Sequence, residues 1–188
     1  MTGSLLLLKF NMFTAEIPRS MNRIIITLLF TIAFPVLNVH AQQKNTETDI
    51  AAIRAAFKEI NTLPLKQEQF KYEADGCVED GNVQYFFKGK EIVKVIESGS
   101  IGDGSWKKEY YYQSGNFIFS YEKLIGGSAG GEITQSEYRV YAKDGAAIRC
   151  MEDQKIVQPD SRASQTLAIA GKLLKAYTTK KFAAALCE

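Results

Sequence analysis

The chain has 188 residues, with 23 lysines and arginines against 21 aspartates and glutamates. Three of the basic residues and one of the acidic residues precede position 42, so residues 42–188 are neutral overall, with 20 charges of each sign. This balance, and the lack of a basic stretch interleaved with aromatic residues, argue against a nucleic-acid-binding protein. The neutral part is long enough for one domain with its own hydrophobic core.

The N-terminal region has the layout of a secretory signal peptide. Starting at Met21, a basic residue precedes an apolar run from Ile24 to Phe34, and a small-residue cleavage site ends at Ala41. The apolar run is shorter than the roughly 20 residues that a membrane span requires, so we expect cleavage after Ala41 and no stable membrane span in the mature chain. Residues 1–41 are therefore assigned to a leader, and residues 42–188 to one domain that is exported to the periplasm or the cell exterior.

A first helix is predicted over residues 45–60, where Ile50, Ile53, Phe57 and Ile60 recur at helical spacing. Pro64 should stop this helix. Residues 66–73 follow as a candidate edge strand.

The middle of the chain, from Val83 to Glu152, repeats the pattern Tyr-x-x-x-Gly-x-x-Ile. The three copies are Tyr85…Gly89…Ile92, Tyr111…Gly115…Ile118 and Tyr141…Gly145…Ile148. Glycine tolerates the positive φ of a tight hairpin turn, so each copy predicts a two-residue turn that ends in its glycine: Lys88-Gly89, Ser114-Gly115 and Asp144-Gly145. In this register each tyrosine faces the isoleucine of its own copy, which is a favourable cross-strand pair.

Three successive hairpins predict one antiparallel sheet. Its strands are expected at residues 83–87, 91–98, 105–112, 116–123, 132–142 and 146–152. The glycine-rich stretch from Ile125 to Gly131 lacks the ending of a phosphate-binding loop and is interpreted as a connection between strands. Asp160 can cap a last helix that runs to about Ala185. The predicted fold class is therefore α+β: an antiparallel meander of six or seven strands with an N-terminal and a C-terminal helix packed on the sheet.

Alternation along the strands predicts two different faces. One is expected to be the core face, because it is mostly apolar: Phe86, Val93, Val95, Trp106, Tyr110, Tyr112, Phe117, Phe119, Tyr121, Tyr138, Val140 and Met151. The opposite, mixed face carries the Tyr–Ile pairs beside charged residues: Lys94, Glu109, Glu122, Glu137 and Arg139. Tyr85, Tyr111 and Tyr141 would form a row of rings on the mixed face, and exposed rows of this kind bind glycans, peptides or partner proteins. The alternative is that a helix covers the row.

The histidine and cysteine positions limit the chemistry. The only histidine, His40, lies in the predicted leader, and a mature domain without histidine has no Ser-His-Asp or Cys-His catalysis. Cys77, Cys150 and Cys187 are candidates for one disulfide in an oxidising compartment, with all three pairings open. Their spacing fits no zinc site, and no metal or cofactor is predicted.

A carboxylate pair remains as a candidate for hydrolysis. In the predicted register, Glu109 and Glu122 lie diagonally across neighbouring strands of the mixed face, with Lys107 beside them. Two carboxylates can hydrolyse sugars when they are about 5–10 Å apart. The alternative interpretation is a solvated charge cluster that Lys107 neutralises.

The segments EYYYQSGNFIFSYEK (109–123) and EYRVYAKDGAAIR (137–149), behind a leader that ends at Ala41, resemble small uncharacterised exported proteins of Bacteroidetes-type bacteria. This resemblance brings no catalytic residues. The hairpins are also distantly similar to MORN-type repeats, but spacings of 26 and 30 residues between the glycines depart from that shorter repeat.

Together these features predict an exported, non-enzymatic binding or interaction module of the periplasm or cell surface. Its partner would be an envelope protein, a peptide or a glycan. Two alternatives stay open: a carboxylate-based hydrolase that acts on an envelope substrate, and a structural envelope protein without a ligand.

Overall fold

The computed structural model describes residues 34–127 and 131–187, with side chains from residue 45 onward. The chain divides into two compact units, residues 1–44 and 45–188. Of the first unit only the helical backbone of residues 34–44 is described, as the start of helix α2 (Phe34–Thr62). The basic start and most of the apolar run of the predicted leader lie outside the described residues.

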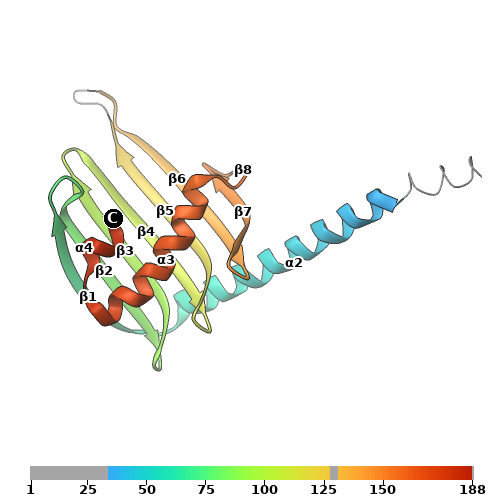
Figure 1. Ribbon diagram of the computed structural model, residues 1–188, viewed down its shortest axis with the longest axis horizontal. Helices are drawn as coiled ribbons and strands as arrows, with labels where there is room; N and C mark the ends of the chain where they lie inside the picture. The colour runs from blue at the N-terminus through green and yellow to red at the C-terminus, as the bar shows by residue number, and fades with distance from the viewer. Residues whose placement is uncertain (1–33, 128–130, 188) are drawn as a thin grey trace, which may run out of the picture. The chain divides into compact units, whose positions relative to one another are not determined.

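This second unit is built on one antiparallel sheet of eight strands, each hydrogen-bonded to the next in sequence (Figure 1). The strands are β1 (Lys66–Ala74), β2 (Val78–Lys88), β3 (Glu91–Ile101), β4 (Gly104–Gln113), β5 (Asn116–Gly126), β6 (Thr134–Lys143), β7 (Ala146–Glu152) and β8 (Lys155–Val157). The predicted α+β class with an antiparallel meander is confirmed. The predicted number of strands was too low, because the short strand β8 follows a further turn at positive-φ residues Asp153 and Gln154.

The helix ends follow local signals only in part. Helix α2 ends two residues before Pro64, as expected, but its helical backbone begins at Phe34, well before the predicted start. Asp160 caps α3 (Ser161–Thr179), since its side chain accepts a hydrogen bond from the backbone N–H of Ala163. The predicted single C-terminal helix is two helices, because Lys180 adopts a left-handed φ of 57° before α4 (Phe182–Leu186).

Helices cover both faces of the sheet. Helices α3 and α4 cross the face that is turned toward the viewer in Figure 1, and residues 45–62 of α2 pack on the opposite face. We call these the α3 face and the α2 face. Tyr110, Tyr111 and Tyr112 alternate between them, and all three are buried. A run of three consecutive buried tyrosines is therefore explained by a sheet with a core on each side.

The tight turns use glycine at positive φ. Two of them match the prediction: Ser114-Gly115 and Asp144-Gly145 have φ values of 50° and 75°, and of 51° and 77°, as a type I′ turn requires. The first hairpin differs. Lys88 pairs with Glu91, so its turn residues are Gly89 and Lys90, with Gly89 at a φ of 66° in the first position.

Each of the three hairpins also carries a β-bulge close to its turn. Tyr112 faces Phe117 but Tyr111 faces Phe119, so Ile118 has no partner in the ladder. The same irregularity leaves Val93 unpaired after the first turn and Ile148 unpaired after the third. The predicted Tyr–Ile pairs are therefore wrong in all three copies, and Tyr85, Tyr111 and Tyr141 face Val95, Phe119 and Arg149.

The bulges divide the predicted core face between the two sides of the sheet, because one extra residue reverses the alternation beyond it. Val93, Phe119, Tyr121 and Met151 lie on the α2 face, whereas Val95, Trp106, Tyr110, Tyr112, Phe117, Tyr138 and Val140 lie on the α3 face. The expectation of one core face and one mixed face is wrong.

A disulfide joins Cys77, in the turn between β1 and β2, to Cys187 at the end of α4. This selects one of the three pairings that the sequence left open. Cys150 is free and fully buried on the α3 face, where burial raises the pKa of its thiol.

Candidate functional site

The three tyrosines predicted as a binding row are core residues. Tyr85 lies on the α3 face with 0% of its surface exposed, and its hydroxyl donates to the carbonyl oxygen of Leu173 at 2.8 Å. Tyr111 and Tyr141 lie on the α2 face, 0% and 5% exposed. The prediction of an exposed row of tyrosines is therefore wrong, because the rings point to different faces of the sheet and helices cover both faces.

The predicted carboxylate pair is also separated by the sheet. Glu109 lies on the α2 face, where it accepts a hydrogen bond from the Tyr111 hydroxyl at 2.5 Å. Glu122 lies on the α3 face and pairs with Arg162 of α3. A substrate cannot reach both carboxylates at once, so the hydrolase mechanism that used this pair is excluded.

Glu109 instead forms a neutralised charge cluster. Lys94 and Lys107 each place an ammonium group 2.9 Å from one of its oxygens. Burial alone would raise the pKa of Glu109, but the hydrogen bonds from Tyr111, Lys107 and Lys94 outweigh it and hold the pKa at about 2. This carboxylate is ionised at neutral pH and forms a structural ion pair with Lys107, as the alternative interpretation expected, but it is largely buried rather than solvated and Glu122 takes no part.

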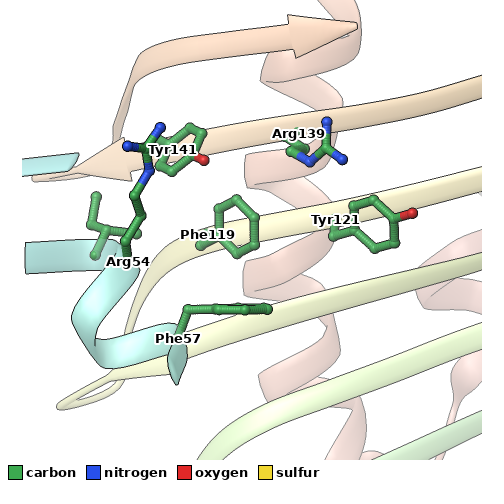
Figure 2. Close-up of a pocket in the computed structure, with 7 residues that line it drawn as sticks. Arg54, Phe57, Phe119, Tyr121, Arg139 and Tyr141 are labelled. Carbon is green, nitrogen blue, oxygen red and sulfur yellow. The ribbon is translucent and has the colours of Figure 1, made fainter. Parts of the chain in front are cut away.

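The α2 face does hold a pocket of about 300 Å³, between α2 and the strands β5 and β6 (Figure 2). Its seven lining residues are Ile53, Arg54 and Phe57 from α2, Phe119 and Tyr121 from β5, and Arg139 and Tyr141 from β6. We call this the α2-face pocket. Of the three predicted binding residues, only Tyr141 contributes to it.

Aromatic rings form the floor and one wall of the α2-face pocket. The ring of Phe119 lies at the centre in Figure 2, with its centroid 4.9 Å from that of Tyr141 and 5.4 Å from that of Phe57. Phe57 is 37% exposed, which is unusual for a phenylalanine within an aromatic cluster. This leaves an accessible apolar surface between the helix and the sheet.

Two guanidinium groups stand at the edges of this aromatic surface. Arg54 extends from α2 toward Tyr141 (Figure 2), with its Cζ atom 5.8 Å from the ring centroid. Arg139 lies 5.2 Å from the ring centroid of Tyr121. Both distances are within the range of cation–π attraction, which holds the two guanidinium groups against the rings.

The two arginines differ in how they are neutralised. Arg139 forms an ion pair with Glu137 at 2.5 Å, and the same carboxylate accepts a hydrogen bond from the Tyr121 hydroxyl at 2.7 Å. Arg54 is exposed and, within residues 45–127 and 131–187, forms no ion pair of 4.0 Å or less. Within the described residues the guanidinium of Arg54 is thus without an ion pair; Glu47 pairs with Arg149, and the pKa of its carboxyl group is lowered mainly by that bond and in smaller part by the charge of Arg54.

Sequence reasoning found parts of this pocket without joining them. Phe57 belonged to the apolar stripe of the first helix, and Arg139 to the charged residues of the mixed face. Arg54 was missed. Arg54 could have been identified from its position: it follows Ile53 of the apolar stripe and therefore lies at the edge of the helix surface that packs on the sheet.

Known proteins offer no guide to this site. Comparison of the chain with profiles of known protein families, with curated proteins and with solved structures finds no match. In the described part of the chain, no group of three histidine, cysteine, aspartate or glutamate residues could hold a metal ion. Among the same residues, no helix combines the length and apolar character needed to span a membrane.

Proposed function

We propose that the domain is an exported, non-enzymatic binding protein whose α2-face pocket takes a small amphiphilic anion. The ligand would have an apolar or aromatic body and one carboxylate, sulfate or phosphate group. The observation that carries this proposal is the exposed guanidinium of Arg54 beside an accessible floor of aromatic rings.

The two parts of such a ligand match the two parts of the pocket. An apolar body on Phe57 and Phe119 gains roughly 25 cal/mol for each Å² of apolar surface removed from water. The planar guanidinium of Arg54 can form two parallel hydrogen bonds with a carboxylate or a phosphate. Arg139 is neutralised by Glu137 and contributes its cation–π contact with Tyr121 to the pocket wall, so the unpaired charge comes from Arg54.

Export is supported by two further features. The pattern from Met21 to Ala41 is typical of a secretory leader, and the Cys77–Cys187 disulfide suits an oxidising compartment. The absence of histidine beyond residue 40 favours binding over the commonest forms of acid–base catalysis.

Two matched fluorescent probes test the proposal: 8-anilinonaphthalene-1-sulfonate, and N-phenyl-1-naphthylamine, which lacks the sulfonate. The wild-type domain should bind the sulfonate saturably, with a 1:1 stoichiometry. Arg54→Gln should weaken sulfonate binding by roughly 5- to 10-fold, about 1 kcal/mol, and leave binding of the neutral probe nearly unchanged.

Lys58→Gln is the matched control, because Lys58 is also exposed on α2 and the substitution removes the same charge. It should leave both affinities unchanged. Phe57→Ala should weaken both probes, since they share the apolar body. The proposal fails if neither probe binds saturably, or if Arg54→Gln and Lys58→Gln have equal effects.

A further inference from the structure

Another cavity, of about 370 Å³, lies on the α3 face, on the opposite side of the sheet from the α2-face pocket. Tyr72, Glu97, Trp106 and Glu122 line its sheet side, and apolar residues of α3 and α4 complete it. Cys77 is also part of the lining, so the disulfide attaches α4 at one end of this cavity.

Glu97 is the most unusual side chain of this cavity. It is only 2% exposed, yet the two hydrogen bonds that fix it come from neutral groups. Its Oε1 accepts from the Tyr72 hydroxyl at 2.8 Å and from the Trp106 indole N–H at 2.5 Å. No lysine or arginine within the described residues forms an ion pair with it, and a buried carboxylate without a cation is costly.

The nearby cations, Lys108 of the lining and Arg162 of α3, pair with Glu122 instead, and Arg162 also pairs with Glu152. Lys108 lies 3.3 Å from one oxygen of Glu122, and Arg162 lies 3.2 Å from the other. The pairing is therefore unequal, with two cations bonded to one buried carboxylate and none bonded to Glu97. A cationic group in the cavity would correct this imbalance.

The surroundings of Glu97 are shaped by two glycines. A Cβ atom on Gly81 would lie 2.5 Å from the ring of Tyr72, and one on Gly99 would lie 2.5 Å from the ring of Trp106. Both rings thus lie directly on glycine backbone of the neighbouring strands, which positions their O–H and N–H groups on Glu97. The same arrangement places ring surface along the cavity, where a cation would gain cation–π attraction.

We propose that the α3-face cavity binds a small organic cation, with a primary ammonium or a guanidinium group paired with Glu97 and an apolar body against Trp106. The proposal rests on observations separate from the α2-face pocket and requires a ligand of the opposite charge. Either site can fail without affecting the other.

Protonation of Glu97 should compete with such a ligand. Burial raises the pKa of Glu97, and the charge of Glu122 adds to this, while bonds from Trp106 and Tyr72 and the charge of Lys108 oppose it. Among the described residues, Tyr110 on β4 also lies near it, and Arg162 on α3 lies beyond Glu122. Because the cation pairs with the carboxylate, its affinity should rise as the pH rises through the pKa of Glu97.

Trp106 supplies the measurement, since it is the only tryptophan of the chain and is bonded to Glu97. Phenethylammonium should change its fluorescence saturably, whereas the uncharged analogue 2-phenylethanol should bind at least tenfold more weakly. Glu97→Gln keeps an oxygen acceptor for Tyr72 and Trp106 but removes the charge, and should weaken phenethylammonium binding at least tenfold. Glu91→Gln, on the same strand but exposed, should leave it unchanged.

A pH series on the wild-type protein keeps the proposal testable if Glu97→Gln does not fold. Phenethylammonium affinity should increase between pH 4 and pH 8. Affinity that does not depend on pH, equal binding of the alcohol and the amine, or no fluorescence change at 10 mM amine would each overturn the proposal.

Discussion

At the scale of single residues, polar groups in the core hold the helices to the sheet. The hydroxyls of Tyr85 and Tyr112 donate to the backbone oxygens of Leu173 and Ala170 in α3. A phenylalanine would fill the same space without this bond, so the tyrosines serve both packing and the placement of α3. Their chemistry is satisfied inside the fold, which explains why they are not available for a ligand.

Glu109 should make the unfolding free energy of the domain depend on pH in the acidic range. Its folded pKa of about 2 is below its ordinary value of 4.5, so its contribution is present above the unfolded pKa and is lost as the pH falls through the folded pKa. The shift corresponds to roughly 3 kcal/mol at neutral pH. Glu109→Gln should therefore lower the unfolding free energy at pH 7 and flatten its decrease between pH 5 and pH 2, measured by urea denaturation. Equal pH profiles for variant and wild type would contradict this.

At the scale of elements, the repeated unit is a tight turn with an unpaired residue beside it. The bulge places Tyr111 and Phe119 opposite each other, with ring centroids 5.7 Å apart, and directs both toward α2. It thereby places Phe119, which lines the α2-face pocket, on the same face as Tyr111, whereas strict alternation would put the two rings on opposite faces. The pattern recurs in the first and third hairpins, so the bulge is a property of the repeat.

The turn positions should respond to substitution according to φ. Ser114→Asn should stabilise the domain by about 0.5 kcal/mol, because asparagine tolerates positive φ in type I′ turns. Gly115→Ala should destabilise it by about 1 kcal/mol although a Cβ there meets nothing within 4 Å, since the cost is conformational. Gly171→Ala is the control: it also has open space but lies in α3, where alanine should stabilise by up to about 1 kcal/mol. Thermal melts would show the sign of each change, and a stabilising Gly115→Ala would refute the turn assignment.

At the scale of the whole domain, the disulfide connects the last helix, α4, to the first turn of the sheet. Cys77 and Cys187 are 110 residues apart in sequence, and their bond fixes α4 against the start of the sheet. Phe182 of α4 packs in the same cluster, stacked on Phe70 of β1 with ring centroids 5.2 Å apart. The disulfide thus stabilises the closing contact of the fold.

Removing this bond should lower the unfolding free energy by roughly 2–4 kcal/mol. The change is Cys77→Ala with Cys187→Ala, compared with wild type in urea with and without a reductant. The double variant should match the reduced wild type and be insensitive to the reductant. Cys150→Ala is the control, which should keep the full reductant sensitivity. A thiol assay on the denatured, unreduced protein should find one free thiol, and three would mean that the bond does not form.

Features that depend on neighbouring residues could be predicted from the sequence. Glycine at positive φ defined two of three turns, Asp160 defined the start of α3, and the succession of hairpins defined an antiparallel meander. The face that each side chain occupies, the pairing of the cysteines and the residues that meet in a pocket depend on how the elements pack and could not be predicted. Both faces of this sheet are buried, so its strands lack the alternation of apolar and polar side chains that would indicate which residues share a face. The consecutive tyrosines Tyr110, Tyr111 and Tyr112 are all buried and therefore fit either register. Packing against α2 and α3 selected the bulged register, and with it both candidate sites.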